Sequence, residues 1–121
     1  MVFRVEPFLI GLVVTPGMLM AHPINTQTAS YTLQSSDCSE PETFVLMNVA
    51  SANTVTVNTG VFSAGCLINV IQIGAGQTTI VAGGGVTLNS AGGALAIGGQ
   101  YQGCTILMTS GSAGVVTGSL A

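Results

Sequence analysis

The stretch INVIQIGAGQTTIVAGGGVTLNSAGG (Ile68–Gly93) decides the fold class of this chain. Its apolar runs are short, rich in Val, Ile and Thr, and separated by glycine clusters, a pattern typical of β-strands joined by turns. Comparable runs continue from Tyr31 to the end of the sequence, and no segment has the sustained 3.6-residue apolar period of a helix. The sequence therefore predicts an all-β fold, a small antiparallel β-sandwich or barrel of about 7–9 short strands.

The glycines of the same stretch are interpreted as turn residues. Gly74–Gln77 (GAGQ) predicts a tight hairpin connection, because glycine adopts the positive φ angles that hairpin turns require. Gly83–Gly85 and Gly92–Gly93 are expected to form the next two turns. The glycine spacing is not constant, which argues against a solenoid built from repeats. Asn69 and Gln72 lie in the central run and need amide partners if they are buried.

The composition indicates a structural role in an assembly. The chain has 121 residues, which suits one domain, and only 4% of them are charged, against about 25% in an average globular protein. No charged residue follows Glu42, so the surface cannot carry the mixed charged coat that disperses a small monomer. We expect the uncharged surface to be shielded in a homo-oligomer, a dimer or a trimer.

The same composition argues against several classes of function. One Arg and no Lys leave too few cations for nucleic-acid binding. GAGQTT lacks the Lys and the following helix of a phosphate-binding loop. Acid–base chemistry would depend on Asp37, Glu40, Glu42 or His22, and the acidic segment SSDCSEPE is best explained as a solvated loop. We therefore predict no enzyme and no cofactor.

The cysteines predict neither a metal site nor a disulfide framework. Cys38, Cys66 and Cys104 are odd in number and widely spaced, without a C-x-x-C motif. Buried thiols packing as small apolar groups are the expected state, and a Cys66–Cys104 bridge stays open as an alternative.

Residues 1–30 differ from the rest and predict an extended apolar N-terminal arm and linker, followed by a β bead domain over residues 31–121. Pro7, Pro16 and Pro23 oppose a continuous helix, and the apolar run is too short and broken to span a membrane. Part of the arm is expected to lie on a partner chain, although it could instead fold back as an edge strand of its own domain. The expected partner-binding residues are Phe3, Phe8, Leu9, Ile10, Leu12, Val13, Met18 and Met20.

Four stretches together resemble a known family: YTLQSSD (31–37), MNVASANTVTVNTG (47–60), the opening stretch and YQGCTILM (101–108). They are similar to a small β-module of tailed-bacteriophage virion surface proteins, which include head decoration (cement) proteins, head fibres and tail fibres. The resemblance extends from Tyr31 to about Leu120. The chain departs from the module at Asn58, where a proline is common, at Asn89, where a basic residue is common, and in having no Trp.

The resemblance implies a decoration protein on the outer surface of a phage capsid, assembled in the host cytoplasm. Its arm would bind the major capsid protein and its bead would contact neighbouring copies. The alternative is a head-fibre or tail-fibre module that binds host surface glycans, for which exposed aromatic residues are expected among Tyr31, Phe44, Phe62 and Tyr101. A third possibility is a secreted or surface-adhesive β-protein.

Overall fold

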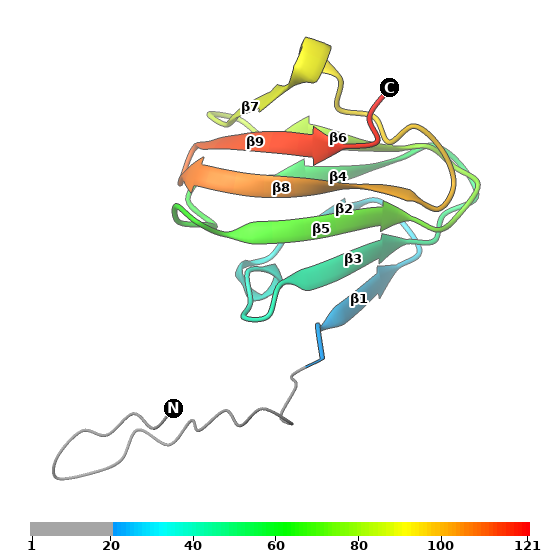
Figure 1. Cartoon of the computed structure of the whole chain (residues 1–121), viewed down its shortest axis with the longest axis horizontal. Helices are drawn as coiled ribbons and strands as arrows, with labels where there is room; N and C mark the ends of the chain where they lie inside the picture. Colours follow the sequence, from blue (N-terminus) through cyan, green and yellow to red (C-terminus); the bar gives the residue numbers. More distant parts are fainter. Residues whose placement is uncertain (1–20) are drawn as a thin grey trace, which may run out of the picture.

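The structure, a computed structural model, describes residues 21–121, which form two stacked β-sheets (Figure 1). The larger sheet has six strands in the order β1-β3-β5-β8-β9-β7, and the smaller has three in the order β2-β4-β6. The strands are β1 (Ile24–Gln27), β2 (Tyr31–Thr32), β3 (Thr43–Met47), β4 (Asn53–Val57), β5 (Leu67–Gln72), β6 (Thr78–Ala82), β7 (Thr87–Ser90), β8 (Gln102–Ser110) and β9 (Ala113–Gly118). The all-β prediction is confirmed.

The chain winds between the two sheets as a β-solenoid. From β1 to β6 each strand lies in the other sheet from its predecessor, and the neighbours within each sheet are parallel. Partners in β3 and β5, and in β4 and β6, are 25 residues apart. The predicted antiparallel sandwich or barrel is therefore wrong, because β8 and β9 supply the antiparallel pairings of the described sheets.

The uneven glycine spacing was interpreted as evidence against a solenoid, and this interpretation is wrong because the coils differ in length. Partners in β1 and β3 are only 20 residues apart, so the first coil is shorter than the second. The 25-residue repeat preserves only scattered identities, in which Val45 matches Val70, Ala50 matches Ala75, Thr54 matches Thr79, Gly60 matches Gly85 and Val61 matches Val86. Alternating burial is the same in parallel and antiparallel sheets, so periodicity alone could not distinguish them.

The chain crosses between the sheets at two edges of the solenoid. At the first, the connections 28–30, 48–52 and 73–77 are short and lie above one another; we call this the glycine edge. At the second, the connections 33–42, 58–66 and 83–86 include the 3₁₀ helix Ser35–Asp37; we call this the disulfide edge. In Figure 1 the glycine edge is at the right, where the arrows of β1, β3 and β5 end.

Close backbone stacking explains the glycines of GAGQ. The backbone N–H of Gly74 donates to the carbonyl of Met47 at 3.0 Å, and that of Gly76 donates to Val49 at 2.9 Å. A Cβ on Gly76 would overlap the backbone of Ser51 one coil below. The predicted hairpin is wrong, since β5 and β6 lie in different sheets and these glycines are needed for close approach rather than for positive φ.

The core fills the space between the two sheets with apolar side chains from both. Completely or almost completely buried are Leu33, Val45, Met47, Val55, Val57, Ile68, Val70, Ile80, Ile97, Ile106, Met108 and Val116. The strands that contribute to this core point alternate residues inward, as the two-residue period of a β-strand requires.

Buried polar groups beside this core are paired at the glycine edge. The Gln72 amide accepts from the backbone N–H of Thr78 at 3.0 Å and donates to the carbonyl of Gly74 at 3.2 Å. The Thr78 hydroxyl donates to Asn53 at 2.7 Å. Half-buried Asn69 instead accepts from the hydroxyl of Thr105 at 2.8 Å, so both amides questioned from the sequence have partners.

The two ends of the solenoid differ. The β8–β9 hairpin is inserted between β5 and β7, and the segment around Leu95–Ile97 pairs with the free side of β6. At the other end β1 and β2 are edge strands with no further neighbour among the described residues. β1 lies within the segment that the sequence predicts to be a linker. Among residues 21–121, no helix is long and apolar enough to cross a membrane.

Candidate functional site

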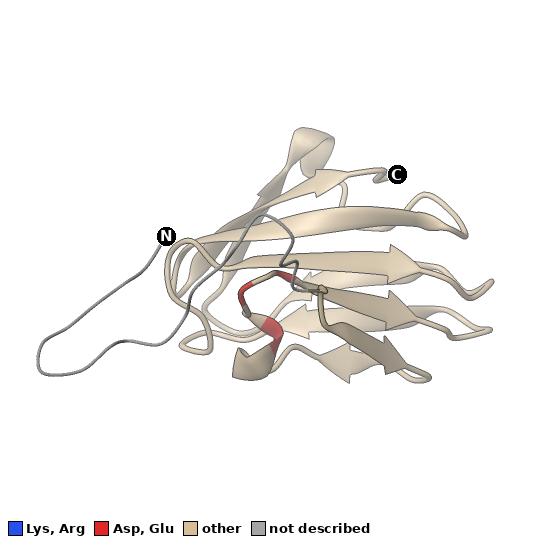
Figure 2. Ribbon diagram, turned by 60° about the horizontal axis from the view of Figure 1, so that its bottom comes forward, with Lys and Arg blue, Asp and Glu red and all other residues tan. Residues whose placement is uncertain are grey.

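The acidic residues of the described chain lie together on one connection of the disulfide edge (Figure 2). Asp37 is buried, and its carboxylate accepts hydrogen bonds from the Tyr31 hydroxyl at 2.7 Å, the Asn25 amide at 2.9 Å and the backbone N–H of Gln34 at 2.8 Å. The prediction of a solvated loop is therefore wrong for Asp37, although Glu40 is exposed. Three donors satisfy this carboxylate, which joins β1 and β2 to the 3₁₀ helix.

The other titratable groups nearby are His22 and Glu42, which contact each other at the start of β3. The Nδ1 of His22 donates to the backbone carbonyl of Glu42 at 2.6 Å, and its ring packs edge-on against Phe44 with centroids 5.2 Å apart. Its Nδ1 is also 3.7 Å from the Glu42 carboxylate. Within residues 21–121, no three His, Cys, Asp or Glu side chains converge as metal ligands would.

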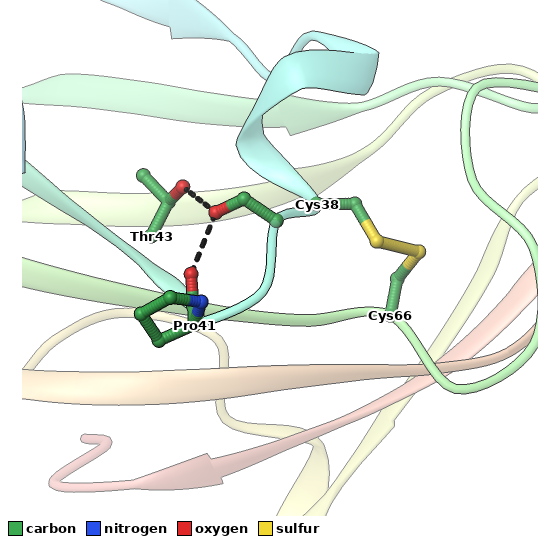
Figure 3. Close-up of a disulfide and its surroundings, with 5 residues drawn as sticks. Cys38, Pro41, Thr43 and Cys66 are labelled. Carbon is green, nitrogen blue, oxygen red and sulfur yellow. Dashed lines mark hydrogen bonds between the residues drawn. A yellow bond between two sulfur atoms is a disulfide. The ribbon is translucent and has the colours of Figure 1, made fainter. Parts of the chain in front are cut away.

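The cysteines differ from the sequence prediction. Cys38 and Cys66 form a disulfide that ties the connection before β3 to the residue before β5 (Figure 3). Beside it, the Ser39 hydroxyl lies 2.8 Å from the carbonyl of Pro41 and 2.7 Å from the Thr43 hydroxyl. The bridge contradicts the predicted free thiols at Cys38 and Cys66 and the alternative pairing of Cys66 with Cys104.

Cys104 is the cysteine that stays unpaired in the described chain, and it is buried. Burial raises the pKa of its thiol to about 12. A neutral, inaccessible thiol is a poor nucleophile and a poor metal ligand, so Cys104 is part of the core.

The outward faces of the two sheets differ in chemistry. The smaller sheet presents mainly threonines, Thr32, Thr54, Thr56 and Thr79, with Val81 beside Thr56; we call this surface the threonine face. The larger sheet presents apolar side chains between neutral polar ones, with Leu67, Leu107 and Val115 in register across β5, β8 and β9. We call this second surface the apolar face.

The large apolar side chains that are exposed in the described chain belong to the larger sheet. Ile24 on β1 is 68% exposed, and Leu107 and Val115 are also exposed. Tyr101, directly before β8, is 75% exposed, whereas Phe62 is buried and both Tyr31 and Phe44 are half-buried. Of the four aromatic residues considered from the sequence, Tyr101 is the one that solvent reaches freely. Its position beyond the strand end was not evident from the alternation of the sequence.

The residues predicted to bind a partner lie outside the described part of the chain. They are Phe3, Phe8, Leu9, Ile10, Leu12, Val13, Met18 and Met20, and their role stays a prediction. The candidate surface that the structure does describe is therefore the apolar face together with the β1 edge. Comparisons with protein-family models, curated proteins and solved structures find no match to this chain.

Proposed function

We propose that this chain is a non-enzymatic structural protein of a bacteriophage virion, a decoration (cement) protein that binds the outside of the capsid and stabilises contacts between capsid subunits. The observation that carries the proposal is the apolar face. A small protein with Leu107 and Val115 exposed in register, and with its acidic residues Glu40 and Glu42 only at the margin of that face beside Leu67, has a surface suited to contact with protein.

The proposal assigns two contacts to two parts of the molecule. The apolar face would pack against neighbouring copies in a dimer or trimer, since uncharged, complementary surfaces lose little on desolvation. Residues 1–20 directly precede the region that leads into β1, so the arm would bind the major capsid protein from the β1 end of the solenoid. The threonine face, whose hydroxyls are well hydrated, would remain in solvent.

The Cys38–Cys66 disulfide is relevant to whether the protein resides in a reducing or an oxidising compartment. Cytoplasmic thiols are kept reduced, whereas extracellular proteins retain disulfides. On a capsid assembled in the host cytoplasm and then released, the Cys38 and Cys66 thiols would be oxidised by dissolved oxygen outside the cell. The same bridge favours a second candidate, a secreted or surface-adhesive β-protein, in which it would form during export.

Quantitative mass spectrometry of purified phage particles tests the proposal. A decoration protein is expected at a copy number comparable to that of the major capsid protein, and deletion of residues 1–20 should remove it from the particle. A few copies per particle would instead favour the fibre alternative. Absence from the particles, with the chain recovered from the culture medium, would overturn the virion proposal in favour of a secreted protein.

A matched pair of variants tests the role of the apolar face. Leu107→Lys places a charge at the middle of that face, and Thr56→Lys places the same charge on the threonine face. Sedimentation velocity should show at least a tenfold weaker self-association for Leu107→Lys and no change for Thr56→Lys. Equal effects of the two substitutions would remove the apolar face from the proposed interface.

A further inference from the structure

A shallow hollow of about 280 Å³ lies on the apolar face near the point where β8 begins. Phe44 of β3 borders it on one side and Thr117 of β9 on the other, while Asn69 and Thr105 line it between them. Gly103 has no side chain to fill the space beside Ile71, which explains why the surface is depressed at this point. The hollow is separate from the acidic residues and from the disulfide.

The lining of the hollow is neutral and able to form hydrogen bonds. The Oδ1 of Asn69 accepts from the Thr105 hydroxyl, which leaves the two N–H groups of the Asn69 amide without a partner among the described residues. The Thr117 hydroxyl is likewise unpaired within residues 21–121 and is exposed. No charged side chain lines the hollow. Its ligand would therefore be uncharged and would both donate and accept hydrogen bonds.

Tyr101 adds an aromatic surface at the same hollow. Its ring is largely exposed, and its backbone has φ 63°, a left-handed conformation that is unfavourable for a bulky residue. A hydrogen bond from its backbone N–H to the carbonyl of Gln72 at 2.6 Å holds this conformation. An exposed ring held at such a position is suited to stack on the C–H groups of a ligand.

We propose that this hollow binds a neutral saccharide, with the C–H face of a pyranose ring on Tyr101 and its hydroxyls on Asn69, Thr105 and Thr117. Sugars combine an apolar face with hydroxyl groups that donate and accept, which matches this lining more closely than a purely apolar ligand does. The hollow lies on the apolar face, so a saccharide bound there and a second copy packed over that part of the face would exclude each other, whereas attachment to the capsid through residues 1–20 would be unaffected. The site would give either a decoration protein or a fibre module a contact with carbohydrate.

Saturation-transfer difference NMR on the purified full chain tests the site. The probes are glucose, galactose, mannose and N-acetylglucosamine, each offered separately at millimolar concentration. At least one of them should receive saturation at its ring protons, and Tyr101→Gly should lower its affinity at least tenfold. Glycine accepts the positive φ of this position, so Tyr101→Gly removes the ring without straining the fold. Its circular dichroism spectrum and thermal midpoint should match or exceed those of the parent chain.

Two further variants separate the hydroxyl contact from a general effect on the sheet. Thr117→Val removes the hydroxyl in the hollow at nearly constant shape and should weaken binding severalfold. Thr26→Val, at an exposed position of β1 outside the hollow, should leave it unchanged. Absence of saturation transfer to all four sugars, or equal transfer with Tyr101→Gly, would overturn the proposal. Neither result would bear on the copy number of the protein in phage particles.

Discussion

The glycine edge and the disulfide edge move the chain between the same two sheets by different means. At the glycine edge, the connection 73–77 hydrogen-bonds directly to the connection 48–52, so at Gly74 and Gly76 the backbones approach too closely for side chains. At the disulfide edge the connections 33–42 and 58–66 are longer, and the Cys38–Cys66 bridge joins them, while the Asp37 carboxylate fixes the first of them to β1 and β2. In Figure 3 the bridge joins the connection before β3 to the segment before β5.

The two edges of this short solenoid are therefore stabilised differently: backbone hydrogen bonds join the coils at the glycine edge, and side-chain contacts join them at the disulfide edge. The glycine edge needs small residues and is sensitive to any added atom. The disulfide edge tolerates a varied sequence but depends on a few specific side chains. This difference predicts which substitutions each edge accepts.

The largest effect is expected from removing the bridge at the disulfide edge. Cys38→Ala with Cys66→Ala frees a loop with a sequence separation of 28 residues, and chain-entropy arguments predict a loss of about 3.5 kcal/mol in the free energy of unfolding. Urea titration of the full chain measures this loss. A reducing agent should destabilise the parent chain to the same level and leave the double variant unaffected.

Cys104→Ala serves as the control for this experiment. Cys104 is buried and takes no part in the bridge, so its variant should keep the sensitivity to reducing agent. A parent chain whose stability does not respond to reducing agent would contradict the role assigned to the disulfide edge.

A slightly smaller effect is expected at the glycine edge. Gly76→Ala would place a Cβ against the backbone of Ser51 and force two coils apart, at a cost of about 3 kcal/mol. Gly84→Ala is the matched control, because Gly84 lies at the disulfide edge with open space around it and without positive φ. Its stability should stay within about 0.5 kcal/mol of the parent. Equal thermal midpoints for the two variants would argue against the stacked backbone.

The smallest effect concerns the carboxylate at the disulfide edge. Tyr31→Phe removes the hydroxyl that donates to Asp37 and accepts from Asn25, which should lower the free energy of unfolding by about 1.5 kcal/mol near neutral pH. Burial, and then the hydrogen bond to Asp37, raise the pKa of Tyr31. The folded chain therefore binds this proton more tightly than the unfolded chain does.

The sign of the pH dependence follows from that shift. The contribution of Tyr31 is fully present below about pH 10, the pKa of a solvated tyrosine, and is lost as the pH rises through the higher pKa of the folded state. Stability curves of the parent and Tyr31→Phe should therefore converge in alkali. Cys104 also titrates in alkali, but it is present in both chains, so the difference between their free energies of unfolding reports on Tyr31 alone. A difference that stays constant with pH would show that the hydroxyl does not titrate with folding.

The sequence predicted the strands well but not their pairing. Thr43–Met47 and Leu67–Gln72 lie in runs predicted to be strands, but Thr43–Met47 is apolar on both faces, and only the structure shows that Val45 points inward and Phe44 outward. Whether two such strands are parallel depends on where the connection between them runs, and a connection of variable length carries little signal of its direction. The first coil has 20 residues and the second has 25, so the sequence shows no constant repeat length.

The candidate sites were predicted less well than the strands. Tyr101 was a candidate from its residue type, but its exposure depends on a left-handed backbone directly before β8, where its N–H bonds to Gln72 at the end of β5. The hollow combines residues of β3, β5, β8 and β9, which are distant in sequence. The partner of Cys66 could not be found by spacing, because it depends on which two connections of the disulfide edge lie side by side.

By itself the sequence determined the β character and the absence of charge after Glu42, since these follow from local propensity and composition. Only the tertiary structure decided that the strands wind as a solenoid, that GAGQ stacks on the coil below, and that Cys38 meets Cys66. The physical reason is that strand direction, backbone stacking and disulfide pairing are contacts between residues far apart in the chain, and local propensity does not encode them.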